Sequence, residues 1–358
     1  MKQTKILISY VLTVMLMIVS LAGCKKSPDK LLSEYGSGVV MVVNQYYYKL
    51  TLPTGKEWYF TGFDKDGEME NFTFDQQEIV KNRAVLTGTG FFVSADGKIL
   101  TNRHVATPSI DFADAKHSVR NVFQSFKQMI REEMRQMSNS YDELESQKSD
   151  CYGYDYYGEM TVDQEKLDEI TTQQQQLSEA YNADAEIWNQ IDNIDVNDIK
   201  IEPVYDVYVA YNNTFVTKMT DLVPCVVTSV SKDAEVDLAM LQLKDKKTPD
   251  GKTVFEASDD DSELKPGEQL YMIGFNAGFS LSNTSQGIKA QITGGNISQV
   301  SDNNKIMYTI PALPGSSGSP VLDEYGKLVA VNFAGISTTQ SFNYGIHLKK
   351  VRRFLSEN

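Results

Sequence analysis

Apolar and polar residues alternate, with glycines between them, over two long stretches of the chain, residues 38–107 and 201–348. Alternation at every second position, broken by turn residues, is the pattern of antiparallel strands. The clearest pair of strands covers residues 90–93 and 99–101, and the dipeptide Asp96-Gly97 between them suits a tight hairpin turn. The two stretches therefore predict a mostly β protein with two packed antiparallel β-barrels.

The segment between these stretches, residues 110–198, has a different period. Its apolar residues recur at steps of three and four, with charges between them, at Val119, Phe123, Phe126, Ile130, Met134, Met137, Tyr141 and Leu144, and again at Leu167, Ile170, Leu177, Tyr181, Trp188 and Ile191. This is the period of an amphipathic helix. With the tyrosine-rich connector 151–158, the pattern predicts an antiparallel helical hairpin inserted into a barrel loop. The hairpin either buries only its own apolar stripes, or it gates the cleft, recruits substrate or mediates assembly. A further helix is expected over 349–355.

The N-terminal segment has the features of a targeting sequence rather than of a folded element. Lys2 and Lys5 precede an almost entirely apolar run over residues 6–19, which is short for a membrane span. Residues 21–24, Leu-Ala-Gly-Cys, resemble the bacterial lipobox, in which the cysteine receives a diacylglycerol. We expect residues 1–23 to be a lipoprotein signal peptide, Cys24 to carry a lipid anchor, and 24–35 to be a tether outside the cytoplasm, at a membrane of the cell envelope. The alternatives are an ordinary signal peptide or a short span.

Composition narrows the possible partners. Of the 358 residues, 41% are hydrophobic, which is enough for a sizeable core. Without Lys2 and Lys5 the mature chain has 32 basic and 48 acidic residues, a net charge of −16. Such a surface disfavours nucleic acid and anionic lipid headgroups as partners. Cys151 and Cys225 give no reason to favour a disulfide, and without paired Cys or His spacings we expect no metal or cofactor.

The candidate chemistry begins at residues 314–320, Pro-Gly-Ser-Ser-Gly-Ser-Pro, directly before an apolar strand. A serine hydroxyl is a weak nucleophile that needs a neighbouring base and N–H groups to hold the developing oxyanion. Glycines at 315 and 318 allow a turn in which the N–H groups of Gly315 and Ser317 point to one place. Ser317 is therefore the candidate nucleophile. The alternative is a flexible Gly/Ser loop without chemistry.

Two further segments supply partners for such a serine. His104 directly follows the hairpin of residues 90–101, and an imidazole can accept and return a proton near neutral pH. Asp237 immediately precedes the apolar run 238–243, which suits a buried carboxylate that orients an imidazole. Asp233 is a second candidate, but it lies four residues further from that strand.

Taken together, these segments resemble the trypsin-like (chymotrypsin-fold) serine proteases, especially bacterial HtrA/Deg-type protease domains, in which the order along the chain is also His, Asp, Ser. The resemblance covers roughly residues 36–107 and 200–355, and we assign 36–109 and 199–358 to the protease domain and 110–198 to an insertion. It implies that His104 is the general base, that Asp237 orients it, and that Ser317 attacks the substrate. The N–H groups of Gly315 and Ser317 would form the oxyanion hole. No PDZ domain, which relatives often carry, is expected here.

The same resemblance implies a primary specificity pocket made by Pro311, Phe333, Gly335 and His347. Pro311 occupies the place where trypsin has the aspartate that reads basic side chains, so cleavage after Arg or Lys is not expected. A small or medium apolar preference is expected, with His347 an ordinary hydrogen-bonded core residue. The alternative is that His347 pairs with an acidic substrate side chain, as a histidine does in glutamyl endopeptidases.

These inferences combine into one expected function. The chain is expected to be an extracytoplasmic serine endopeptidase that acts on proteins or peptides through an acyl-enzyme intermediate. The competing class is a catalytically silent or gated trypsin-fold protein that binds partners, or acts like a chaperone, in the envelope. The presence of all three triad side chains and of both loop glycines favours the enzyme.

Overall fold

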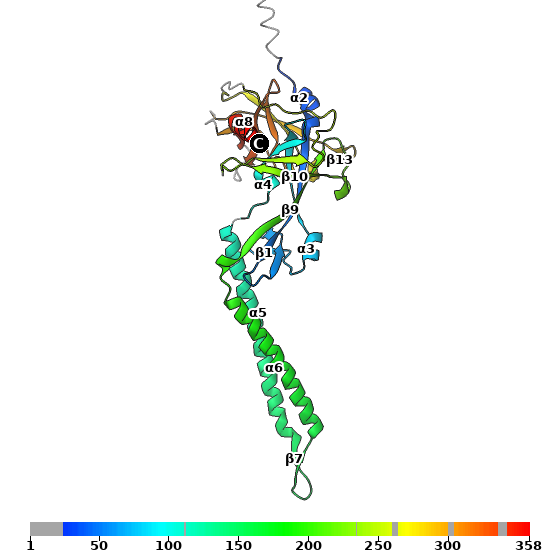
Figure 1. Cartoon of the computed structure of the whole chain (residues 1–358), viewed down its shortest axis with the longest axis vertical. Coiled ribbons are helices and arrows are strands. Elements are labelled where there is room, and N and C mark those ends of the chain that lie inside the picture. The colour runs from blue at the N-terminus through cyan, green and yellow to red at the C-terminus, as the bar shows by residue number, and fades with distance from the viewer. Residues whose placement is uncertain (1–23, 111, 234, 260–263, 300–303, 336–341) are drawn as a thin grey trace, which may run out of the picture. The chain divides into compact units, whose positions relative to one another are not determined.

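The computed structural model describes residues 24–358 apart from 111, 234, 260–263, 300–303 and 336–341 (Figure 1). The chain forms two compact units. The first contains residues up to Tyr46 with Arg83–Ser109 and Pro203–Asn358, and the second contains Tyr47–Asn82 and Ile110–Glu202. Residues 47–82, which the sequence assigned to the protease domain, therefore group with the helical insertion.

The first barrel is a closed antiparallel sheet. Its strand order is β1 (Val39–Thr51), β5 (Ala84–Phe92), β6 (Lys98–Thr101), β11 (Ala239–Leu243), β10 (Val223–Val230) and β9 (Lys200–Tyr211). Strand β9 pairs with β1 again and closes the barrel, and β2 (Glu57–Phe60) extends the sheet beyond β1. The predicted hairpin is present, since Phe91 pairs with Leu100 and Phe92 with Ile99.

The second barrel is a curled six-stranded sheet. Its strand order is β15 (Gln291–Asn296), β12 (Gln269–Gly274), β17 (Pro320–Asp323), β18 (Leu328–Gly335), β19 (Asn343–His347) and β16 (Lys305–Tyr308). A bridge between Ile297 and Tyr308 brings its two edges together. Helix α8 (Leu348–Ser356) follows β19. The predicted fold class, two antiparallel barrels with a helical insertion and a C-terminal helix, is confirmed.

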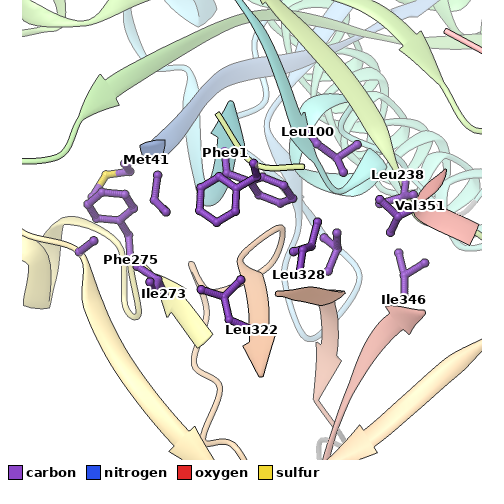
Figure 2. Packing of buried hydrophobic residues seen from close by; sticks show 14 of the residues in the cluster. Met41, Phe91, Leu100, Leu238, Ile273, Phe275, Leu322, Leu328, Ile346 and Val351 are labelled. Carbon is purple, nitrogen blue, oxygen red and sulfur yellow. The ribbon is translucent and has the colours of Figure 1, made fainter. Parts of the chain in front are cut away.

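One apolar core joins the two barrels. Figure 2 shows side chains of both barrels meeting in this core, with Val351 of α8 beside them. They are Met41, Phe91, Leu100 and Leu238 from the first barrel and Ile273, Phe275, Leu322, Leu328 and Ile346 from the second. Burying each large apolar side chain contributes roughly 1.5–3 kcal/mol. This shared core fixes one barrel against the other, and with them the loops that carry the candidate site.

The segment expected to be a tether is partly folded. Helix α2 (Pro28–Tyr35) begins with Ser27 as its N-cap and proline at its first position, a common helix start. Leu31 is fully buried in the shared core. The backbone N–H of Lys26 donates to the carbonyl of Glu324 at 2.7 Å. The chain is thus attached to the protein from Lys26 onward, which leaves little slack after Cys24.

The second unit contains the predicted helical hairpin. Helices α5 (Phe112–Gln147) and α6 (Gln164–Asp192) lie side by side and antiparallel, and β7 (Tyr152–Tyr154) and β8 (Met160–Val162) join them (Figure 1). Three tyrosines in this connection are strongly exposed, Tyr154, Tyr156 and Tyr157. Within the described part of the chain no helix has the length and apolar character to cross a membrane.

The remaining elements are short. They are helices α3 (Gln76–Lys81), α4 (Arg103–Ala106) and α7 (Phe279–Ser282), strands β3 (Gly62–Phe63), β4 (Met69–Glu70), β13 (Asn283–Thr284) and β14 (Gly287–Ile288), and the 3₁₀ turns Gly36–Gly38, Lys148–Cys151, Val196–Asp198 and Met219–Asp221.

An aromatic cluster holds the second unit together. The ring of Trp58 on β2 makes edge-to-face contacts with Phe72, Phe74 and Phe123, at centroid distances of 5.5, 5.5 and 5.3 Å. Trp58 is 8% exposed, whereas Phe74 at the edge of the cluster is 59% exposed. Because Phe123 lies on α5, the tryptophan links the hairpin to the strands of its own unit.

We expect Trp58→Ala to lower the free energy of unfolding of the second unit by about 3–5 kcal/mol, the usual cost of emptying a large aromatic site. Phe74→Ala is the matched control and should cost about 1 kcal/mol, because its ring is mostly in water. Urea unfolding followed by the helical circular dichroism signal measures both. Equal losses in the two variants would contradict the central place of Trp58.

Candidate active site

His104 stands on a single helical turn at the end of β6. The turn α4 begins after Asn102, whose buried side chain donates from Nδ2 to the carbonyl of Asp237 at 2.8 Å. The N–H of Arg103 donates to the same carbonyl at 3.3 Å. These two bonds join the end of β6 to Asp237, two residues before β11 begins, so that His104 and Asp237 meet although they lie 133 residues apart in sequence.

Asp237 holds His104 with both carboxylate oxygens. Nδ1 of the imidazole lies 2.5 Å from Oδ2, and the backbone N–H of His104 donates to Oδ1 at 3.0 Å. Because a carboxylate can only accept, the first bond requires the proton on Nδ1. That leaves Nε2 with a free electron pair, the form that a general base needs. The alternative acid, Asp233, instead lies 3.7 Å from Nζ of Lys350.

The surroundings keep Asp237 ionised. Its side chain is 18% exposed, and this burial by itself raises the pKa. The hydrogen bond from the His104 ring, the attraction to that ring and the hydrogen bond from its backbone N–H outweigh burial, so the pKa of Asp237 lies below its usual value. The carboxylate is therefore charged at neutral pH and can stabilise an imidazolium.

The Ser317 loop lies against the first barrel. The N–H of Thr89 on β5 donates to the carbonyl of Ser317 at 2.8 Å, and Oγ1 of Thr89 donates to the carbonyl of Gly315 at 2.8 Å. A Cβ on Gly318 would lie 3.2 Å from the backbone nitrogen of Asn102, two residues before His104. The loop is thus held beside the His104 turn. Between the described side chains of Ser317 and His104 there is no hydrogen bond, a bond that in ligand-free sites often tightens only with substrate.

Thr89 is a site residue that the sequence analysis did not select. It is fully buried, and its Oγ1 also accepts from the N–H of Phe275 at 3.0 Å. One side chain therefore connects β5, the Ser317 loop and the end of β12. In the sequence it stands between two glycines, Gly88 and Gly90, within the strand that contains Phe91, and this glycine flanking is the one signal that sets it apart.

Gly318 has no room for a side chain. Its φ is +87°, and a Cβ there would lie 2.0 Å from the carbonyl oxygen of Thr89. We expect Gly318→Ala to push the loop away and lower kcat/KM by about 10²-fold or more, since a displacement of 1 Å can cost that much. Gly251→Ala is the control, because Gly251 has a similar φ of +78° but nothing within 4 Å. Peptide hydrolysis by both variants measures the effect, and equal activity would contradict the close approach.

The N–H groups expected to form the oxyanion hole are free. Gly315 has φ +99°, and the carbonyl of Pro314 accepts from the N–H of Ala277 at 2.6 Å. In a trans peptide the C=O and N–H point to opposite sides, so the N–H of Gly315 points away from Ala277. Among the described residues no group accepts a hydrogen bond from the N–H of Gly315 or of Ser317. Both remain available to a substrate oxygen.

The predicted pocket residues have different surroundings. Pro311 is exposed in the segment before the loop, and Gly335 ends β18. The half-buried ring of Phe333 lies 6.4 Å from that of Tyr344, with Nζ of Lys305 5.3 Å from its centroid. His347 is the N-cap of α8, and its Nδ1 accepts from the N–H of Lys349 at 3.0 Å. That nitrogen of His347 therefore caps a helix.

Metal ligands are not gathered in the part of the chain that the structure describes. No group of three or more His, Cys, Asp or Glu side chains there could hold a metal ion. None of the three cysteines forms a disulfide, and burial raises the pKa of Cys225 to about 12, which makes its thiol unreactive.

The two-barrel fold, with a histidine–aspartate pair beside a glycine-rich serine loop, is the arrangement expected of a trypsin-like serine peptidase. The comparison with family models agrees, because residues 202–331 match the model described as "Trypsin-like peptidase domain". The chain therefore contains a trypsin-like peptidase domain and is a serine endopeptidase, a hydrolase of protein or peptide substrates.

Other comparisons are more distant. No curated protein matches the chain. Among solved structures, the serine endoprotease from Yersinia pestis is 12% identical with a TM-score of 0.43, and the match covers 93% of this chain and 67% of that one. An HtrA-type protease, AlgW, solved with a tripeptide, is 14% identical with a TM-score of 0.43, covering 92% of this chain and 62% of that one. Because both TM-scores are below 0.5, nothing about the site is inferred from these two structures.

Proposed function

We propose that this protein is a lipid-anchored, extracytoplasmic serine endopeptidase in which His104, Asp237 and Ser317 form the catalytic triad. The observation that carries the proposal is the double hydrogen bond from His104 to Asp237. A histidine held through Nδ1 and its own backbone N–H has one free nitrogen, Nε2, in the neighbourhood of the Ser317 loop. A Ser-His-Asp triad requires this arrangement of its histidine and aspartate.

The proposed reaction runs in two halves. Oγ of Ser317 attacks the carbonyl carbon of the scissile peptide bond while its proton passes to Nε2 of His104. The carbonyl oxygen becomes an oxyanion that accepts hydrogen bonds from the N–H groups of Gly315 and Ser317. When the C–N bond breaks, the leaving amine takes the proton from His104, and the substrate acyl group remains on Ser317 as an ester. Water, deprotonated by His104, then hydrolyses this ester and restores the serine.

Asp237 acts through the imidazole. Its charge stabilises the imidazolium that forms in each half-reaction, and its bond to Nδ1 keeps the ring turned toward the serine. The depressed pKa of Asp237 supports this role, since a carboxylate that is already ionised at neutral pH can stabilise a cation without first losing a proton.

Burst kinetics test the proposed mechanism. With an activated ester of a small apolar residue, the purified protein should release one equivalent of alcohol rapidly and then turn over slowly, because acylation precedes hydrolysis. It should also cleave unfolded casein at internal bonds after small or medium apolar residues. An intact, folded protein that shows neither burst nor cleavage would reject the endopeptidase and favour the binding or chaperone-like alternative.

The membrane location rests on the Leu-Ala-Gly-Cys sequence of residues 21–24. Cys24 is exposed, and the chain after it is attached to the protein by Lys26. In a bacterial host the wild-type protein should fractionate with membranes, and the mass of its N-terminal peptide should include the acyl chains on Cys24. Cys24→Ser should release the protein in soluble form. Equal membrane binding of the two forms would reject the anchor while leaving the peptidase proposal intact.

A further inference from the structure

A buried polar network lies directly beneath the Ser317 loop. Asn332 on β18 is 1% exposed, and its Nδ2 donates to the carbonyl of Ser316 at 3.0 Å and to Oγ of Ser316 at 3.2 Å. Its Oδ1 accepts from the hydroxyl of Tyr308, which is fully buried, at 2.8 Å. The backbone of Asn332 adds a bond, since its carbonyl accepts from the N–H of Gly318 at 2.8 Å. Asn332 therefore binds the residues on both sides of Ser317.

The bond to the Ser316 carbonyl has a consequence for the oxyanion hole. The C=O of Ser316 and the N–H of Ser317 belong to the same peptide unit, and the described chain has no cis peptide bond. In a trans unit these two groups point to opposite sides of the chain. By holding the carbonyl on the β18 side, Nδ2 of Asn332 points the N–H of Ser317 away from Asn332.

Tyr308 fixes which way round the Asn332 amide lies. The tyrosine hydroxyl needs an acceptor, so Oδ1 faces it and Nδ2 faces Ser316. If the amide were reversed, Oδ1 would face the Ser316 carbonyl, and two buried acceptors would repel each other. Complete burial raises the pKa of Tyr308 well above its usual value, so this hydroxyl remains a donor over any working pH range.

We propose that Asn332 is a positioning residue for catalysis, which sets the direction of the Ser317 N–H in the oxyanion hole through its bond to the Ser316 carbonyl, with Tyr308 locking the Asn332 amide. The inference rests on the proposed function, because it assigns a cause to one part of that machinery. A purely packing role would be filled better by an apolar side chain, since a buried amide must replace the hydrogen bonds it loses to water.

Asn332→Asp should give kcat a pH dependence that a purely packing role of Asn332 would not produce. As a carboxylic acid, the new side chain can donate its proton to the Ser316 carbonyl. As a carboxylate it can only accept, and it repels that oxygen. Burial raises the pKa of such a carboxyl. The kcat of this variant should therefore fall as pH rises, by about 10²-fold, the cost of losing one oxyanion-hole donor, with KM nearly unchanged. The wild-type side chain is an amide at every pH, so the kcat of the wild-type protein should show no such fall.

Two further variants and a matched control complete the test. Asn332→Leu has no donor at any pH and should lose kcat throughout, and it should bind a peptide aldehyde, which forms an oxyanion on Ser317, about 10²-fold more weakly. Tyr308→Phe keeps the volume and removes only the hydroxyl, and a smaller loss in the same direction is expected. Asn212→Leu is the control for a buried amide, because Asn212 bonds to Gly36 and Ala290 instead.

The outcomes separate the inference from the proposed function. If the kcat of Asn332→Leu equals that of the wild-type protein, Asn332 has no positioning role. The same conclusion follows if Asn332→Leu and Asn212→Leu lose equal amounts of kcat. A wild-type protein inert toward the activated ester would count against the proposed function. In that case crystal structures of wild type and Asn332→Leu decide the inference, because it requires the peptide unit between residues 316 and 317 to rotate in the variant. An unrotated unit would reject it.

Discussion

Ser317→Ala is expected to lower kcat for peptide hydrolysis on the order of 10⁶-fold, with KM little changed. The substitution removes the atom that forms the acyl-enzyme and leaves the backbone N–H groups and the binding surface in place. His104→Ala should cost about as much, and the double variant should lose no more than either single one, because a nucleophile without its base is already inactive. Steady-state hydrolysis of a fluorogenic peptide measures all three.

A neighbouring serine provides the control for this result. Ser319 is fully buried two residues further along, and its hydroxyl has no hydrogen-bond partner among the described residues. The kcat of Ser319→Ala should therefore stay within about tenfold of the wild-type value. The substitution changes the local packing slightly, and such a change usually costs about 1 kcal/mol. A Ser317→Ala protein as active as Ser319→Ala would exclude Ser317 as the nucleophile.

Asp237→Asn is expected to lower kcat by about 10⁴-fold. The carboxamide has nearly the shape of the carboxylate, so Oδ1 can still accept from the backbone N–H of His104. Its NH₂ group, however, faces Nδ1 as a donor. The imidazole then carries its proton on Nε2 and cannot act as a base. Asp233→Asn, beside Lys350 rather than His104, is the matched control and should remain active. Comparable losses in the two variants would contradict the assignment of Asp237.

The same residue predicts a pH dependence of stability. The pKa of Asp237 is lower in the folded than in the unfolded protein, so folding is favoured while the group is ionised. This contribution is fully present above the unfolded value of about 3.9 and is lost as pH falls through the lower, folded value. The difference in free energy of unfolding between wild type and Asp237→Asn should therefore be largest at neutral pH and narrow below about pH 4. A constant difference would contradict the depressed pKa.

Local sequence patterns predicted most of the fold. The alternation over 90–101 predicted the β5–β6 hairpin, and the steps of three and four over 119–144 predicted α5. Both patterns depend only on neighbouring residues and on which face is buried. The placement of Asp237 rather than Asp233 beside His104 was expected from one local fact, the position of Asp237 immediately before the apolar run 238–243, which includes the buried strand β11.

Contacts between distant segments could not be predicted in this way. Thr89 and Gly315 lie 226 positions apart, and a threonine in a strand looks the same whether its hydroxyl meets water or a loop. Asn332 likewise looks like a polar interruption of an apolar strand until Tyr308 and Ser316 are seen around it. The helix α2 was taken for a tether, because its short polar sequence gives no hint that Leu31 is buried in the shared core.

Mapping of a covalent adduct tests the central claim most directly. The purified protein is treated with a fluorophosphonate, and the modified residue is located by peptide mass spectrometry. We predict one adduct, on Oγ of Ser317, which disappears in His104→Ala. The neighbouring Ser316 and Ser319 are buried and should remain unmodified. A folded wild-type protein with no adduct, or with its adduct on another serine, would contradict the account of Ser317 as an activated nucleophile.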